Sequence, residues 1–324
     1  MKNSFYMQSG LFFFSLMSSI IICLSSNSFL SMWMSMEINL FSMIPLISIN
    51  QKIFSEKSTM MYFLIQGISS SIIIITIISN IKLTKSIMLI FIFMAIFMKL
   101  GLSPFHFWMI SMIEGIKWNL AFIIMTVQKI IPICILMFFI HQKMIIFMCL
   151  MNSMIVALSG VTMYSMRKLM GFSSINHLSL MLISMILSKK IFKMYFLIYS
   201  LMTLSATKSM QLMNMNFLSQ TMTIFKMSKI NNLNNLIIFL SMAGIPPFLG
   251  FMPKMITIML MMKSNMIFSV LVILLLNTIT TFLYLRISLN NILMNLNFKK
   301  TFKVKKKTKL PLYLLFSPLY LLMS

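Results

Sequence analysis

Long apolar runs separated by short polar connections make up almost the whole chain. Runs of about 20 residues recur, and a helix of that length crosses about 30 Å of hydrocarbon. Lipid cannot hydrogen-bond a free backbone, and the two-residue alternation of a membrane barrel is absent, so helices are the expected spanning element. The pattern predicts an all-α polytopic membrane protein. The expected segments are 4–24, 29–49, 60–80, 86–110, 118–140, 144–165, 170–188, 191–213, 232–262, 265–286 and 310–323.

Two of these segments are longer than a simple span and contain helix breakers. The fourth carries Gly101 and Pro104, and the ninth carries Gly244, Pro246 and Pro247. Proline removes a backbone donor and clashes with the preceding turn. Unwound backbone at membrane depth is tolerated only where protein or a wet cavity receives it. We therefore expect both segments to face the interior of the bundle.

The break occupies the same place in each half of a single membrane domain, 1–324. It falls in the fourth of five segments in 4–140 and again in the fourth of five in 144–286. An odd number of helices per half inverts the second half, and broken helices at matching positions are a known transporter signal. A basic loop, 287–309, and a short C-terminal helix, 310–324, complete the prediction.

Charge is sparse and mostly positive. Charged residues are 9% of the chain, hydrophobic residues 60%, with 27 Lys and Arg against 3 acids. The charges lie between apolar runs and form no basic face, which argues against nucleic-acid binding. More of them fall on the side of the N-terminus, which predicts that this end faces the compartment of synthesis. The dense run 299–309 is a solvated loop that anionic lipid attracts.

A few ionisable residues lie inside the apolar segments. Glu37 is the one acid there, and each such charge costs about 2.5–3.5 kcal/mol at the bilayer centre, so it is expected to face the bundle interior. Glu37 and Lys99 are expected at mid-depth, within about 8 Å along the membrane normal. They form either a static ion pair or a pair that switches protonation. Lys129, also at mid-depth, is a proton relay or a packing residue, and Lys254 follows the second break.

Histidine can relay protons near neutral pH. His106 follows the first break, and His177 lies at the position of the second half that corresponds to Glu37. Each is a relay candidate, and each could equally be a hydrogen-bonded structural imidazole. Lys208 lies among small hydroxyl residues, where snorkelling or helix packing is as good an interpretation as function.

Redox chemistry has no visible site in this chain. Cys23, Cys134 and Cys149 lie in apolar runs without CxxC or metal-ligand spacing, so they are interpreted as small buried hydrophobes. A GxGxxG motif, a cysteine set for an iron–sulfur cluster and a haem ligand pair are all missing from the sequence. We expect no metal and no cofactor to be bound by this chain.

Six short segments in a fixed order carry a family resemblance. Their residues follow W-x-x-x-E-(I/M)-N-(L/M) with I-P, then Y-F-L-x-Q, K-(L/I)-G-x-(A/S)-P-F-H-F-W, Q-K-x-x-P, S-S-I-x-H and G-(L/I)-P-P-x-x-G-F-x-P-K. Order and spacing resemble the subunit 2 family of mitochondrial complex I, NADH:ubiquinone oxidoreductase. The segments are Trp33–Leu40 with Ile44–Leu46, Tyr62–Gln66, Lys99–Trp108, Gln128–Pro132, Ser173–His177 and Gly244–Lys254.

The resemblance implies the antiporter-like fold of about eleven helices in two inverted five-helix units. It implies proton-transfer roles for Glu37, Lys99, Lys129 and Lys254, with His106 and His177 as relays. It also implies a place in the mitochondrial inner membrane with the N-terminus in the matrix. Partners would be the other membrane subunits and phospholipids such as cardiolipin. The complex uses NADH, FMN, iron–sulfur clusters and ubiquinone, none of them held by this chain. The weak last segment departs from the family pattern.

The leading hypothesis is a subunit of a proton-translocating NADH:ubiquinone reductase, with the redox site elsewhere in the complex. One alternative is a stand-alone monovalent cation/proton antiporter of the same fold. Another is an assembly scaffold whose lysines only pack helices.

Overall fold

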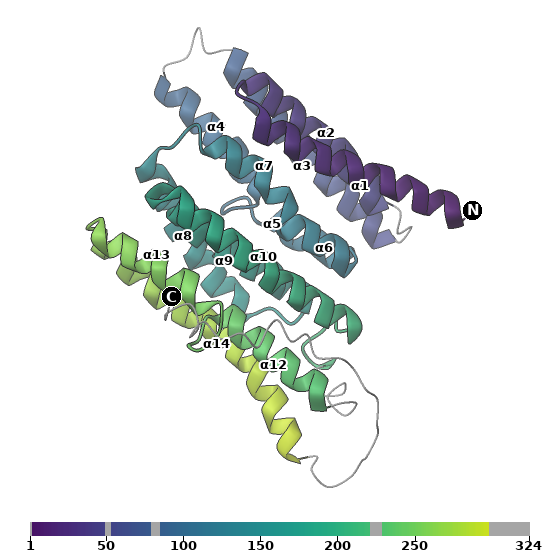
Figure 1. The fold of residues 1–324 in the computed structure, drawn as a ribbon, viewed down its shortest axis with the longest axis vertical. Helices are drawn as coiled ribbons and strands as arrows, with labels where there is room; N and C mark the ends of the chain where they lie inside the picture. Colours follow the sequence, from purple (N-terminus) through teal and green to yellow (C-terminus); the bar gives the residue numbers. More distant parts are fainter. Residues whose placement is uncertain (1, 49–52, 79–84, 221–228, 298–324) are drawn as a thin grey trace. The chain divides into compact units, whose positions relative to one another are not determined.

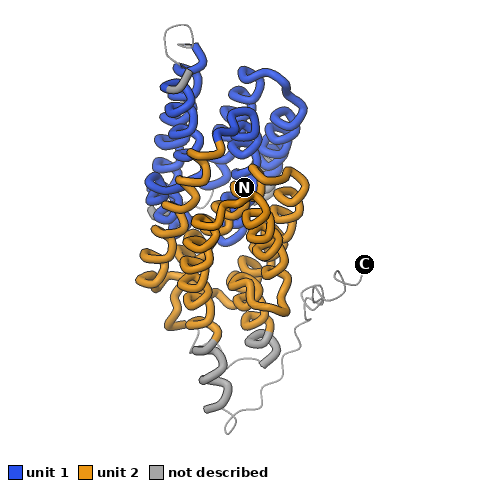
Figure 2. Tube along the Cα trace, turned by 90° about the vertical axis from the view of Figure 1, so that its left-hand side faces the viewer, with its two compact units in different colours: residues 1–141 blue, residues 142–324 orange. Residues whose placement is uncertain are grey.

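The chain is all-helical over the residues that the structure describes. The structure is a computed structural model and describes residues 2–48, 53–78, 85–220 and 229–297. It divides into two compact units, Met1–His141 and Gln142–Ser324 (Figures 1 and 2). Among the described residues, six helical stretches are long and apolar enough to cross a membrane, if Trp118–Leu136 is counted as one of them. The fold is therefore that of a multi-pass membrane protein.

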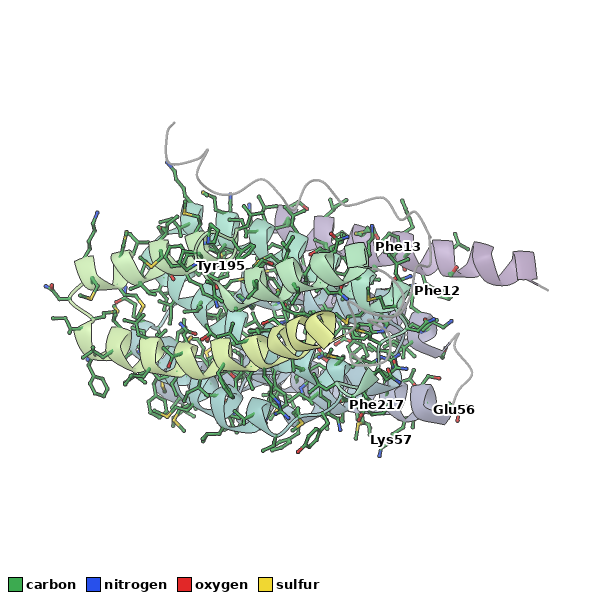
Figure 3. The ribbon with its side chains drawn as sticks, turned by 90° about the horizontal axis from the view of Figure 1, so that it is seen from below. Phe12, Phe13, Glu56, Lys57, Tyr195 and Phe217 are labelled. Atoms are coloured by element: carbon green, nitrogen blue, oxygen red, sulfur yellow. The ribbon has the colours of Figure 1, made fainter. Side chains whose placement is uncertain are left out.

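In the first unit, α1, α2 and α3 pack side by side, α3 contacts α4 and α5, and α7 packs on α1, α2 and α4 (Figure 1). The third helix begins before its apolar stretch, with Glu56 in its first turn, where a carboxylate complements the helix dipole. Glu56 and Lys57 both point outward at this end (Figure 3). The helices are α1 (Lys2–Ser25), α2 (Phe29–Ser48), α3 (Ile53–Ile78), α4 (Lys85–Leu100), α5 (Phe107–Gly115), α6 (Trp118–Met125) and α7 (Val127–Leu136).

The fifth predicted segment, 118–140, is interrupted where we expected a continuous helix. Thr126 lies between α6 and α7 with φ −122° and ψ −72°. Its backbone amide and its hydroxyl both donate to the carbonyl of Phe122, at 3.1 Å and 2.7 Å. Pro132 follows and cannot donate to the carbonyl four residues before it. The helix also ends at Leu136, before the predicted end of the segment.

In the second unit, α9 is the central helix. The spanning window of α9 is 94% buried inside the protein. It packs against α8, α10 and α13, while α14 packs against α8, α12 and α13 (Figure 1). The helices are α8 (Gln142–Val161), α9 (Met166–Leu187), α10 (Lys189–Leu212), α12 (Lys229–Ala243), α13 (Phe251–Lys263) and α14 (Ile267–Asn297).

Each unit contains a Gly/Pro interruption with the same local geometry. Gly101, directly after α4, has φ +68°, and Gly244, directly after α12, has φ +76°, values that glycine adopts without steric cost. A cis peptide bond to proline follows each glycine, Ser103–Pro104 in the first unit and Pro246–Pro247 in the second. The fourth and ninth predicted segments therefore each consist of two shorter helices joined by a turn.

The C-terminal part of the prediction is described only in part. Helix α14 continues to Asn297, so the expected loop 287–309 begins as helix. The rest of that loop and the predicted short helix 310–324 lie outside the described residues.

Candidate functional site

The first unit buries two lysines that the sequence singled out. Lys99 lies in the last turn of α4 and is 7% exposed, and Lys129 lies in the first turn of α7 and is 2% exposed. Glu37, on α2, is half-buried, and its carboxylate is close enough to Lys99 to act on its charge. The carboxylate of Glu37 and the amine of Lys99 therefore interact electrostatically in the first unit.

Lys99 and Lys129 line one small cavity. Its volume is about 20 Å³, enough for about one water molecule, and Tyr62, Gln66 and Gln128 also line it. A second cavity of about 10 Å³ shares Lys99 and these three side chains. In both cavities, polar side chains of the first unit therefore lie beside apolar ones such as Leu100 and Ile131.

Hydrogen bonds tie the cavity walls together across several helices. The Gln128 amide donates to Asn39 Oδ1 at 2.9 Å, and the Tyr62 hydroxyl donates to Gln128 Oε1 at 3.2 Å. The Gln66 amide donates to the backbone carbonyl of Lys99 at 3.2 Å. These bonds join α2, α3, α4 and α7, so the polar groups that surround the two lysines are fixed in place.

At the first interruption, a side chain of α5 is hydrogen-bonded to the backbone of α4. The Trp108 indole nitrogen, on α5, donates to the carbonyl of Met98 near the end of α4 at 3.0 Å. His106 lies in the turn between them, is 4% exposed, and its ring lies 4.1 Å from that of Phe107. His106 does not line the cavities beside Lys99.

Lys254 bridges the two helices of the second interruption. It lies in the first turn of α13, is 6% exposed, and donates to the carbonyl of Ala243 at 2.8 Å and that of Met242 at 3.4 Å. Those carbonyls belong to the last turn of α12, where helix geometry leaves acceptors without an internal partner. Lys254 therefore caps the helix that precedes its own.

His177 belongs to a separate aromatic cluster in the second unit. It lies on α9, is 1% exposed, and its Nδ1 is 3.1 Å from the hydroxyl of Tyr195 on α10. The ring of Tyr199, one turn later, is 5.3 Å from the imidazole. Tyr199 and Tyr284 have hydroxyl partners on α9, Ser174 and Ser173 respectively. Figure 3 shows Tyr195 among packed side chains.

Next to this cluster, Asn176 contacts α14 over long hydrogen bonds. Its amide donates to Asn277 Oδ1 at 3.4 Å and to Thr280 Oγ1 at 3.3 Å. A cavity of about 10 Å³, lined in part by Asn176, Thr280 and Tyr284, lies beside them. The second unit thus has its own polar interior, built mainly from uncharged groups.

Several residues of the site have no distinctive sequence signal. Tyr195 and Tyr199 are four residues apart on one helix face, which is also the spacing of ordinary core residues. Gln66 and Gln128 fall within the family motifs, but a motif match gives no role. For Lys208, the sequence favoured neither a packing role nor a functional one. Its side chain is exposed on α10 and belongs to none of these clusters.

The comparisons with known proteins agree on one family. A model of the NADH:quinone oxidoreductase/Mrp antiporter transmembrane family matches residues 26–280. NADH-ubiquinone oxidoreductase chain 2 of Anopheles gambiae is 35% identical, over 88% of this chain and 86% of that protein. The same subunit of Aedes aegypti is 36% identical, over 89% of this chain and 87% of that protein.

Among solved structures, a chain of respiratory complex I from Thermus thermophilus shares the fold with a TM-score of 0.80. It is 16% identical, and the match covers 88% of this chain and 70% of that one. A chain of the Mrp complex from Dietzia sp. gives a TM-score of 0.72 at 14% identity, over 84% of this chain and 58% of that one. On the family match and the relatives together, this chain belongs to the NADH:quinone oxidoreductase/Mrp antiporter transmembrane family, in the branch of chain 2 of NADH-ubiquinone oxidoreductase.

Proposed function

We propose that this chain translocates protons as a core membrane subunit of mitochondrial NADH:ubiquinone oxidoreductase. Electrons would pass from NADH to ubiquinone elsewhere in the complex, through the FMN and iron–sulfur clusters of other subunits. The observation that carries the proposal is that Lys99 and Lys129 line the same water-sized cavity.

The chemistry of the first unit suits proton transfer. A buried amine changes its charge when a nearby charge or water changes, because burial disfavours the ammonium form and a carboxylate favours it. Glu37 is the carboxylate that acts on Lys99. A water in the shared cavity, with the hydroxyl of Tyr62 and the amide of Gln128 beside it, would connect Lys99 to Lys129. A proton would move from one amine to the other when the carboxylate of Glu37 comes closer to Lys99 or moves away from it.

The second unit would work with different groups. Lys254 donates hydrogen bonds to carbonyls in the last turn of α12. His177 is paired with Tyr195, whose hydroxyl can donate or accept a hydrogen bond. Loss of the Lys254 proton would leave those carbonyls with a weaker partner and would loosen the turn between α12 and α13. His106 would serve as a relay at the first interruption, where it is buried.

The proposal includes the arrangement in the membrane. We infer that the two halves are inverted repeats, supported by the glycine of positive φ that follows α4 in the first unit and α12 in the second. The protein would lie in the mitochondrial inner membrane with its N-terminus in the matrix. Its partners would be the other membrane subunits and phospholipids, cardiolipin among them.

The test is the proton-to-electron ratio of the intact complex in sealed vesicles. Lys129→Met removes the titratable amine and keeps an unbranched side chain of similar length, so the assembled complex is expected to translocate fewer protons per electron. The control is Lys208→Met, which changes an exposed lysine and is expected to leave the ratio unchanged. Normal assembly with the full ratio in Lys129→Met and in Lys99→Met would overturn the proposal and favour the scaffold alternative. Cation/proton exchange by the purified chain alone would favour the antiporter alternative.

A further inference from the structure

Two of the three cysteines meet in the first unit. Cys23 lies in the last turn of α1 and Cys134 in the last turn of α7, and these helices pack together. The side chains of the two cysteines are in hydrogen-bonding contact. Residues 111 positions apart in the chain are thus brought thiol to thiol, which the sequence, with no CxxC motif, did not indicate.

The surroundings hold both helices in this register. Phe29, at the start of α2, stacks on Phe139 with ring centroids 4.6 Å apart and meets Phe138 edge-on at 5.7 Å. The start of α2 therefore packs against the residues that follow α7, next to Cys23 and Cys134. Aromatic pairs of this geometry contribute about 0.5–1.5 kcal/mol beyond the burial of their area.

The two thiols also differ in access. Cys23 is 2% exposed and has the hydroxyl of Ser35 on α2 as a second neighbour. Cys134 is only half-buried. A small oxidant can thus reach Cys134 first, and Cys23 is then placed to attack the activated sulfur, as a resolving cysteine does in redox-sensitive proteins.

We propose that Cys23 and Cys134 form a reversible dithiol/disulfide pair that, when oxidised, tethers α1 to α7. The oxidant is a low-molecular-weight disulfide. Two S–H bonds break and one Sγ–Sγ bond forms between the cysteines, while the two electrons and two protons reduce the oxidant to two thiols. A dithiol reductant reverses the reaction. The inference concerns a modification site and does not depend on the proposed function.

The tether bears on the helix that carries Lys129. Cys134 and Lys129 are five positions apart on α7, about 7.5 Å along the axis, and they point to different sides of the helix. Lys129 lines the polar cavity while Cys134 meets α1. Oxidation would fix α7 against α1 without placing a new group in the cavity.

The test uses membranes that contain the whole complex and needs no variant at first. The membranes are treated with oxidised glutathione or left reduced, then denatured, labelled with a maleimide and analysed by mass spectrometry of this chain. Labelling is expected to fall from 3 cysteines to one, Cys149, and a peptide linked from Cys23 to Cys134 is expected to appear and to vanish with dithiothreitol.

Cys149 supplies the matched control, since it lies on α8 in the second unit and is 1% exposed. Cys149→Ser should keep the linked peptide, and Cys23→Ser and Cys134→Ser should each abolish it. Protection of both thiols by phenylarsine oxide, which needs two sulfurs, is a second measurement on the unmodified chain. Full labelling of Cys23 and Cys134 after oxidation, or linkage of either cysteine to another chain, would overturn the proposal.

Discussion

The close approach of α13 to α12 predicts a large effect of one methyl group. Gly250 immediately precedes α13, and a Cβ atom placed there would collide with the backbone carbonyl oxygen of Ser241. Its φ of −68° suits alanine, so the penalty of Gly250→Ala is steric: the collision with this oxygen, and a close contact of 3.1 Å with Met202 Sδ. The obstacle is backbone and cannot rotate away, and the same oxygen accepts a hydrogen bond from the amide of Gly244 at 3.1 Å.

The magnitude follows from two opposed terms. Inserting an extra methyl group into a packed interior costs about 1–3 kcal/mol, and a rigid neighbour places this site at the upper end. Alanine recovers about 0.5–1 kcal/mol through its smaller loss of backbone entropy. A net destabilisation of about 2 kcal/mol is therefore expected for Gly250→Ala.

The matched control is Gly67→Ala. Gly67 lies inside α3, and a Cβ atom there would meet nothing within 4 Å, so only the favourable helix-propensity term of about 1 kcal/mol remains. The assay is the temperature at which NADH:ubiquinone reductase activity of the membrane-bound complex is lost, with assembled complex measured on native gels. Gly250→Ala should lower that temperature and the yield, and Gly67→Ala should lower neither. Equal behaviour of the two variants would refute the reasoning.

Three further substitutions each remove one side-chain hydrogen bond, and each is tested by the measurement that the bond should affect. Gln128→Leu should cost about 1–3 kcal/mol because it strips Asn39 Oδ1 of its donor, and an unchanged inactivation temperature would contradict this. Tyr195→Phe should cost only about 0.6 kcal/mol, as a membrane hydrogen bond does, yet should reduce the proton-to-electron ratio if the hydroxyl positions His177; an unaltered ratio would count against that role. Trp108→Phe should cost about 1 kcal/mol and loosen α5 from the end of α4, visible as faster proteolysis or hydrogen exchange there.

The helical class and the two Gly/Pro interruptions could be predicted because their causes are local. Long apolar runs require helices in lipid, and glycine and proline limit their own backbone whatever surrounds them. Lys99 and Lys254 could be singled out for a similar reason, since a charge inside an apolar run is costly in any fold.

The remaining features depend on neighbours that the sequence does not specify. The interruption at Thr126 combines a hydroxyl bound to the preceding turn with a proline six residues later, and either is compatible with an intact helix. Tyr195 joins a polar cluster only because α9 presents His177 at its level. Cys23 and Cys134 become neighbours only through the packing of α1 on α7.

The burial of α9 has a consequence for variation along the chain. A helix at the edge of a bundle has a lipid side on which many apolar residues are interchangeable, so tolerated changes recur every three or four positions. Every residue in the run 171–185 of α9 is buried, so this run has no lipid-facing position. Saturation mutagenesis should therefore find intolerance there with no helical rhythm, whereas α8, which has exposed positions such as Met151, Met154 and Leu158, should show that rhythm clearly.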